Sequence, residues 1–179
     1  MSEEEVLKRW EENPMLKPRI GKVTVNISVG KSGVPLENAS KILETLTGQR
    51  PCQRKAKKTI RDFGIRKGEP IACMVTLRRE RAIDFLKRAL QAKNNQLRKE
   101  SFDKFGNVSF GIKEHIEIPG VKYIPELGIY GMDVSVSIER PGYRVKRRRV
   151  KRSKVGRSHM VSREEAIAFL KNEFDVQVV

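Results

Sequence analysis

The stretch Ile20–Gly30, IGKVTVNISVG, alternates apolar and polar side chains along its length. Its apolar residues Val23, Val25, Ile27 and Val29 fall on one side of an extended chain, and Lys22, Thr24, Asn26 and Ser28 fall on the other. Because successive side chains of a strand point to opposite faces, this period of two predicts a strand that is buried on one face only. Such strands are typical of antiparallel sheets with one covered face and one open face.

Further segments extend this pattern along the chain. The alternation returns at 70–78, 107–118 and 131–140, and apolar residues recur at helical spacing at 3–12, 35–47, 79–98 and 163–174. The first and last of these helices begin with a capping box, Ser2 with Glu5 and Ser162 with Glu165. In the 79–98 helix we expect Ile83 to lie on the buried stripe.

These elements predict an α+β fold, in which a mostly antiparallel sheet carries helices packed on one face as an RRM-like or ferredoxin-like sandwich. A chain of 179 residues is long enough to form one domain with a buried core. We expect a core sandwich at 14–140, a basic insertion at 141–160, and a C-terminal helix and tail at 161–179.

The net charge of +16 is concentrated in two segments. Residues 50–68 contain eight cations and one acid, and residues 140–157 contain ten cations and no acid. Concentrated charge on an otherwise nearly neutral chain is typical of proteins that bind a polyanion. Solvated basic loops are the alternative, and a membrane surface is disfavoured because neither segment has the apolar face of an interfacial helix. The 140–157 segment offers little to bury, so we expect it to be disordered alone.

Several kinds of chemistry are excluded or unsupported. The two cysteines are 21 positions apart and only two histidines exist, so we expect no metal site and no cofactor. The string VGKSG at 29–33 lacks the first glycine of a phosphate-binding loop, because Val25 stands there. His115 has no nucleophile beside it, and we expect it to face outward from its strand. No run of eighteen apolar residues exists, and the acidic N-terminus does not resemble a signal peptide.

The polar face of the predicted sheet is a candidate binding surface. It carries Lys22, Thr24, Asn26, Thr76, Arg78, Ser135 and Ser137, interrupted by Asp133. An open polar sheet face is a recurring platform for RNA, although a merely solvated face has the same pattern. Phe63 is a further candidate, because cations and a glycine flank it: it either stacks on a base or ribose or folds back over its own loop.

Residues 48–81, GQRPCQRKAKKTIRDFGIRKGEPIACMVTLRRER, closely resemble the corresponding stretch of the large-subunit ribosomal protein L-five family. The first strand, KVTVNISVG, and the later segments FDKFGNVSFGIKEHIEIPG and GIYGMDVSV resemble its strands in the same order. The resemblance covers most of residues 14–140. The terminal RPGY…SREEAIAFL resembles the archaeal and eukaryotic branch, since the bacterial type lacks this basic insertion. Arg79 stands where bacterial members commonly have a small residue.

This resemblance implies a structural, non-enzymatic constituent of the large subunit in the cytoplasmic ribosome. Family members bind 5S rRNA in the central protuberance, reach toward the P-site tRNA with a basic loop, and contact the small-subunit head. The implied partners are 5S rRNA, large-subunit rRNA, P-site tRNA, and ribosomal proteins of the central protuberance and of the small-subunit head.

The implied site residues fall into three sets. Those for 5S rRNA are Lys22, Thr24, Asn26, Thr76 and Arg78. The tRNA-contacting loop comprises Lys55, Lys57, Lys58, Arg61, Phe63 and Arg66. The rRNA anchor comprises Arg144, Lys146, Arg147, Arg148, Arg149, Lys151, Arg152, Lys154 and Arg157. An RNA-modifying enzyme, a DNA-compacting protein and a regulatory RNA- or DNA-binding protein outside the ribosome are the alternatives.

Overall fold

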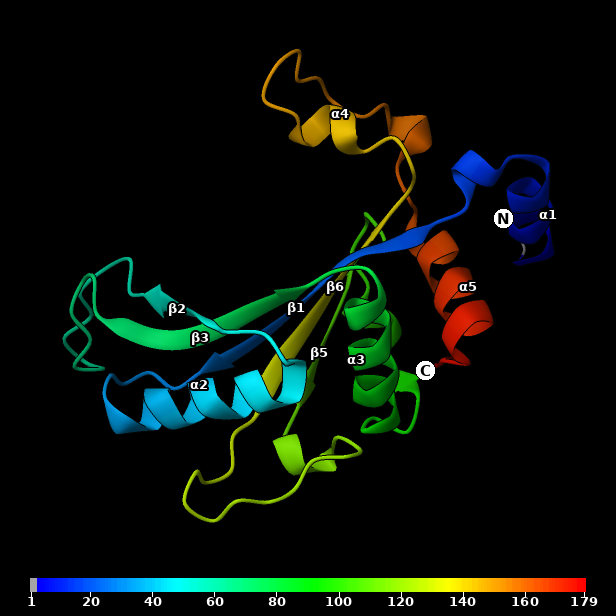
Figure 1. Cartoon of the computed structure of the whole chain (residues 1–179). Helices are drawn as coiled ribbons and strands as arrows, with labels where there is room; N and C mark the ends of the chain where they lie inside the picture. The colour runs from blue at the N-terminus through cyan, green and yellow to red at the C-terminus, as the bar shows by residue number, and fades with distance from the viewer. Residues whose placement is uncertain (1–2) are drawn as a thin grey trace.

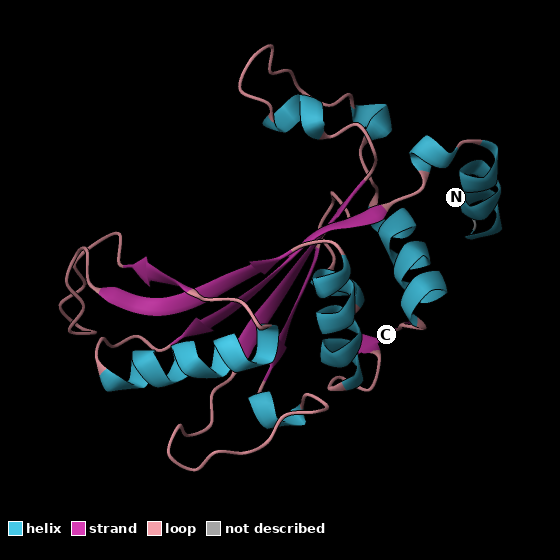
Figure 2. Cartoon of the chain, viewed as in Figure 1, coloured by secondary structure: helices cyan, strands magenta, loops and turns pink. Residues whose placement is uncertain are grey.

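The structure is a computed structural model that describes residues 3–179, so the predicted cap at Ser2 lies outside the described residues. Five strands form one antiparallel sheet in the order β2-β3-β1-β6-β5 (Figures 1 and 2). Their bounds are Arg19–Ser28 for β1, Cys52–Lys55 for β2, Pro70–Leu77 for β3, Val108–Ile112 for β5 and Met132–Glu139 for β6. The predicted α+β sandwich is confirmed.

The helices are segregated to one face and one end of the sheet. Helices α2 (Val34–Thr47) and α3 (Glu80–Gln91) cover the same face, as Figure 1 shows. Helices α1 (Glu3–Glu12) and α5 (Arg163–Phe174) pack against each other beyond the end of the sheet. Short elements complete the chain: η1 Pro14–Leu16, η2 Lys99–Ser101, η3 His115–Glu117, α4 Arg144–Arg147 and η4 Arg157–His159.

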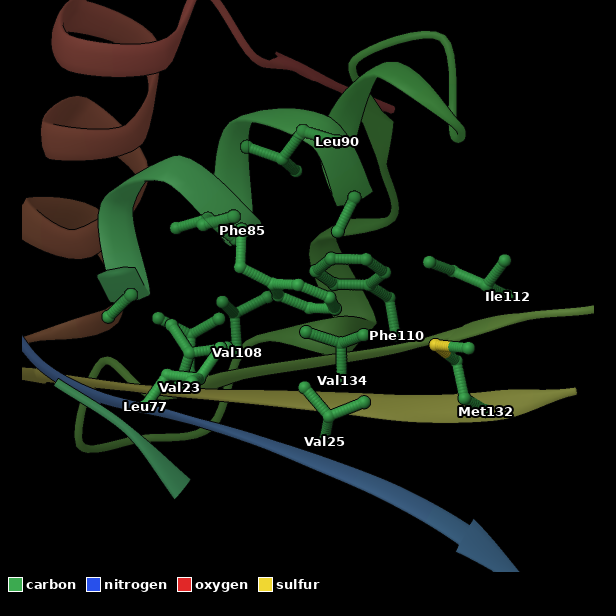
Figure 3. Close-up of a cluster of buried hydrophobic side chains, with 14 of the residues drawn as sticks. Val23, Val25, Leu77, Phe85, Leu90, Val108, Phe110, Ile112, Met132 and Val134 are labelled. Atoms are coloured by element: carbon green, nitrogen blue, oxygen red, sulfur yellow. The ribbon is translucent and has the colours of Figure 1, made fainter. Parts of the chain in front are cut away.

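The core lies between the covered sheet face and helices α2 and α3. Val23 and Val25 of β1 are fully buried, and Phe85 and Leu90 of α3 pack over the same layer (Figure 3). Each such side chain contributes about 1.5–3 kcal/mol when it leaves water. A slip of one residue in β1 would turn this apolar row outward, so burial fixes the register of the central strand.

Helix α3 ends earlier than its pattern predicts. It stops at Gln91, and Asn94 and Asn95 then adopt positive φ values of 53° and 54°. A right-handed helix requires negative φ, so it cannot extend through these residues. The chain then forms β4 (Gln96–Leu97), which pairs in parallel with β7 (Gln177–Val178), a small sheet that the sequence did not predict. Ile83 is 37% exposed, so its predicted place on the buried stripe is wrong.

Arg79 joins β3 to α3 in an unusual conformation. Its φ of 55° lies in the left-handed region that glycine adopts readily and larger residues adopt at a cost. A glycine would adopt this geometry without the steric cost that the Arg79 Cβ imposes.

His115 is buried, which corrects its predicted outward position. Strand β5 ends at Ile112, and the chain turns into η3 with the His115 side chain only 3% exposed. Its Nδ1 accepts a hydrogen bond from the Tyr130 amide at 3.3 Å, while its own amide donates to the Tyr130 carbonyl at 3.0 Å. These bonds join the two ends of the loop between β5 and β6. Burial lowers the pKa of His115, and the nearby Glu114 carboxylate partly offsets this shift.

Arg140 is also buried, although it belongs to the 140–157 segment that we expected to be disordered alone. Its guanidinium forms an ion pair with Glu165 of α5, and both side chains are more than nine-tenths buried. Nη1 of Arg140 also donates to the Ser158 carbonyl at 3.2 Å. The same Glu165 completes the predicted capping box with Ser162, which is confirmed.

Two aromatic side chains close the base of the segment that follows. The His159 Nε2 lies 2.8 Å from the Pro141 carbonyl, and the Tyr143 hydroxyl donates to the His159 carbonyl at 3.3 Å. Hydrogen bonds therefore join the two ends of residues 141–160, which we call the basic arm. The expected disorder of this segment is therefore wrong for its two ends and for helix α4, because the ends of the arm contain groups that can be buried.

We predict that Arg140→Ala and Glu165→Ala each destabilise the fold by about 3–5 kcal/mol, because each leaves an uncompensated buried charge. Replacing both residues with methionine and leucine should recover most of that loss. The measurement is the free energy of unfolding in urea. The matched control is Arg147→Ala, which removes a partly exposed ion pair with Glu139 and should cost about 0–1 kcal/mol. Single variants as stable as the control would contradict the prediction.

We also predict that His115 makes stability depend on pH. Its folded-state pKa is lowered, so below an unfolded pKa of about 6.5 the unfolded chain binds the proton first. This contribution is present above pH 6.5 and is lost as the pH falls toward the folded-state value. The free energy of unfolding should therefore fall more between pH 7.5 and 5.5 in the wild type than in His115→Asn. Parallel pH profiles for the two proteins would refute this role.

Candidate nucleic-acid interface

The open face of the sheet gathers the predicted 5S rRNA residues into adjacent rows. Thr24 of β1 lies directly between Thr76 of β3 and Ser135 of β6. Strand β5 extends this row with Ser109, whose hydroxyl donates to the Ser135 hydroxyl at 3.2 Å. Four neighbouring strands therefore present a continuous line of hydroxyl groups, about 14 Å across at a strand spacing of about 4.8 Å.

The neighbouring rows add the amide of Asn26 and the cation of Lys22. Asn26 lies two residues along β1, between Met74 and Asp133, and Lys22 lies two residues the other way, beside Ser137. The side-chain amide of Asn26 donates to the Ser28 hydroxyl at 2.8 Å, which orients it on the face. The predicted parity of the outward side chains is thus confirmed.

Gly21 shapes the cationic edge of this face. A bulge at this glycine shifts the register between Ile20 and Lys22, and a Cβ there would lie 2.8 Å from the Glu139 carboxyl carbon. The Arg78 guanidinium approaches the Gly21 carbonyl at 3.5 Å. Lys22 and Arg78 therefore lie at the same end of the face. Glu139 lies beside Gly21 at that end and is ion-paired with Arg147, and Asp133 lies at the opposite end. Most of the face offers neutral hydrogen-bonding groups.

The hydroxyl groups at the centre of the face are available to a partner. In the part of the chain that the structure describes, Thr24 and Thr76 make no side-chain hydrogen bond, and both are half-buried between their neighbours. Helices α2 and α3 lie on the other side of the sheet, so nothing among the described elements covers this face (Figure 1). Short, oriented polar side chains of this kind can contact sugar hydroxyls and base edges.

The hairpin loop between β2 and β3, residues 56–69, forms the second part of the interface. Ile60 and Ile65 pair across it, and a turn closed by a hydrogen bond from the Gly64 amide to the Arg61 carbonyl places Phe63 at the tip. Phe63 is 73% exposed, so it does not fold back over the loop. All six predicted residues of the tRNA-contacting set are exposed: Lys55, Lys57, Lys58, Arg61, Phe63 and Arg66.

Glu69, which sequence reasoning missed, holds this loop in shape. Its carboxylate accepts hydrogen bonds from the Ser32 hydroxyl at 2.6 Å and from the Arg66 amide at 3.0 Å. These bonds, the one from Ser32 first, lower the pKa of Glu69. The loop therefore uses this carboxylate to bind its own backbone, and its cations remain turned outward.

The basic arm forms the third part. All nine cations of the predicted anchor are exposed: Arg144, Lys146, Arg147, Arg148, Arg149, Lys151, Arg152, Lys154 and Arg157. Arg147 is partly neutralised by an ion pair with Glu139, and Nε of Arg148 donates to the Lys151 carbonyl at 2.7 Å. The arm is therefore a folded cationic projection with one of its cations held by an ion pair at its base.

The topology places the hairpin loop and the basic arm at opposite ends of the sheet. Strands β3 and β6 both run antiparallel to β1 and hence run in the same direction. The hairpin loop precedes β3 and the arm follows β6, so the open face lies between two cationic ends (Figure 1).

The described residues hold no arrangement typical of metal or membrane sites. Among residues 3–179, no three His, Cys, Asp or Glu side chains gather closely enough to bind a metal ion. Cys73 is buried, which raises the pKa of its thiol, and Cys52 is exposed on β2. Within the same residues, every helix is too short or too polar to cross a bilayer.

Comparison with known proteins gives consistent matches. Residues 13–66 match the family described as Ribosomal protein L5, and residues 70–171 match the model of the C-terminus of the same ribosomal family. The chain is 57% identical to large ribosomal subunit protein uL5 of Aeropyrum pernix, over 98% of this chain and 92% of that protein. It is 58% identical to the protein of that name from Pyrobaculum aerophilum, over 93% of each. Its identity to the Methanococcus vannielii protein is 51%, over 95% of this chain and 96% of that one.

The two matched segments together extend from the strand β1 region through the basic arm into helix α5, and the relatives match at nearly full length. The chain therefore belongs to the ribosomal protein L5 family.

Proposed function

We propose that this protein is a non-enzymatic structural component of the large subunit of the cytoplasmic ribosome and binds 5S rRNA through its open sheet face. Family membership supports the ribosomal assignment. The observation that carries the 5S assignment is the register, which places Lys22, Thr24, Asn26 and Thr76 in adjacent rows on an uncovered face.

Charged and neutral side chains of the face contact different parts of the RNA. Lys22 and Arg78 neutralise phosphates along one edge and so set the orientation of the RNA. Thr24, Asn26 and Thr76 contact ribose hydroxyls or base edges at the centre. Because these groups are short and belong to a rigid sheet, they accept one folded RNA surface better than others.

The hairpin loop extends this interface toward the P-site tRNA. Its cations attract the phosphates of the tRNA, and Phe63 at the exposed tip stacks on a base or ribose. The Ile60–Ile65 pairing and the Glu69 bonds keep the tip extended from the sheet. A loop built in this way reaches a partner that lies beyond the RNA on the sheet face.

Two further surfaces complete the proposed assembly in the central protuberance. The basic arm anchors large-subunit rRNA through its exposed cations and gains further order on contact with that RNA. The loop between β5 and β6 exposes Tyr123, Ile124 and Ile129, which suits contact with a protein of the small-subunit head.

We predict that Asn26→Ala combined with Thr76→Ala weakens binding to purified 5S rRNA by roughly 5- to 150-fold, because two neutral hydrogen-bonding groups are lost. The dependence of affinity on salt should stay the same, since no cation is removed. Thr45→Ala is the matched control, because its hydroxyl binds the Lys41 carbonyl on helix α2. Wild-type protein that binds unrelated structured RNA and duplex DNA as tightly as 5S rRNA, at matched salt, would refute the proposed function.

We predict the opposite pattern when residues 144–154 are deleted. Each phosphate contact that is lost should flatten the slope of log affinity against log salt by about 0.7–0.9. The hydrogen bonds that join the two ends of the arm are retained, because Arg140, Tyr143 and His159 lie outside the deletion. The preference for 5S rRNA over unrelated RNA should persist, and its loss would show that the arm, and not the sheet face, selects the RNA.

A further inference from the structure

A second exposed aromatic side chain lies far from the hairpin loop. The Phe105 loop, residues 103–107, connects η2 to β5 and leaves the Phe105 side chain 48% exposed. Its sequence DKFG resembles the RDFG of the hairpin tip in one respect, because each phenylalanine precedes a glycine with positive φ, 76° for Gly106 and 65° for Gly64. Both turns therefore present a ring to solvent.

The Phe105 loop is held rigidly by Asp103. One carboxylate oxygen accepts hydrogen bonds from the amides of Phe105 and Asn107, and the other accepts one from the Asn107 side chain, all at 2.8 Å. The backbone closes the loop with a bond from the Asp103 amide to the Asn107 carbonyl at 2.9 Å. These bonds define the shape of the loop backbone through polar groups, and about half of the ring surface is left to solvent.

The loop is seated against the end of the basic arm. A Cβ on Gly106 would lie 2.8 Å from Cγ1 of Val161, 3.1 Å from Cβ of Ala166 and 3.2 Å from the Ser162 carbonyl. Val161 directly follows the arm, and Ser162 caps α5. The Phe105 loop thus lies beside the C-terminal end of the basic arm, most of whose exposed side chains are cationic.

The local charge suits an anionic partner. The Lys104 ammonium lies 5.3 Å from the centre of the Phe105 ring. The one acid of the loop, Asp103, is engaged by three hydrogen-bond donors. Because this ammonium lies over one face of the ring, a base would stack on the other face or displace it, and Lys104 would then lie close to the adjacent phosphate.

We propose that Phe105 is a stacking platform for an unpaired base of ribosomal RNA, with Lys104 contacting the adjacent phosphate. The proposal rests on the ribosomal function proposed above and adds a binding position outside the sheet face, the hairpin loop and the basic arm. Aromatic rings bind unpaired bases with little dependence on sequence, whereas neighbouring cations follow the backbone. The Asp103 bonds hold the loop backbone, so little backbone freedom is lost when the ring binds a base.

The test compares Phe105→Ala and Phe105→Trp for binding to purified 5S rRNA and to deproteinised large-subunit rRNA. Phe105→Ala should weaken binding to one of them by about 5- to 140-fold with an unchanged salt slope, and the RNA affected identifies the source of the base. Phe105→Trp should bind as tightly as the wild type. Unchanged affinity of Phe105→Ala for both RNAs would overturn the proposal.

Two controls separate this proposal from the proposed function. Val34→Ala removes an exposed apolar side chain from helix α2 and should leave both affinities unchanged. Wild-type protein that fails to prefer 5S rRNA counts against the proposed function, whereas a preference that Phe105→Ala leaves intact on both RNAs counts against Phe105 alone.

A spectroscopic measurement reports stacking directly. Trp10 is the one tryptophan of the chain, so Phe105→Trp in a Trp10→Phe background carries a single emitter. RNA should quench its fluorescence and shield it from acrylamide. Emission that stays fully accessible to acrylamide in the bound state would refute stacking at this position.

Discussion

Each strand of this sheet can bury only one of its two rows of side chains, because helices α2 and α3 lie on one face. That constraint fixes the register of β1, since Val23, Val25 and Ile27 must all point to the helices. The same register turns Lys22, Thr24 and Asn26 to the open side. The residues proposed to select RNA are therefore placed by the apolar residues between them, and a change in the core would disturb the binding face.

In the proposed function, affinity and selectivity come from different parts of the molecule. Its excess charge lies in the hairpin loop and the basic arm at opposite ends of the sheet, whereas the face between them is mostly neutral. Cations attract any nucleic acid, because phosphate contacts carry no direct sequence information. We propose that the oriented hydroxyl and amide groups on the rigid sheet distinguish one folded RNA from another. Hydrogen bonds of Glu69 in the hairpin loop and of Arg140 at the start of the basic arm keep the cations of both segments directed outward.

The sequence predicted what depends on local periodicity. The period of two in β1 and β3 yields the open face, and the capping box at Ser162 marks the start of α5. It did not predict what depends on distant partners. The burial of Arg140 requires Glu165, twenty-five positions away, and the burial of His115 requires the chain to leave the sheet and return at Tyr130. Phe105 shares one local feature with Phe63, because each ring precedes a glycine. Its nearness to the arm exists only in three dimensions.

The central claim is that the open sheet face selects the RNA. The most direct measurement is a titration of isotope-labelled protein with 5S rRNA, followed through the NMR signals of its backbone amides. The largest changes are predicted in β1, β3 and β6 at the rows of Lys22, Thr24 and Asn26, with little change in α2 and α3. Changes confined to the hairpin loop and the basic arm, with the strands unaffected, would contradict the account.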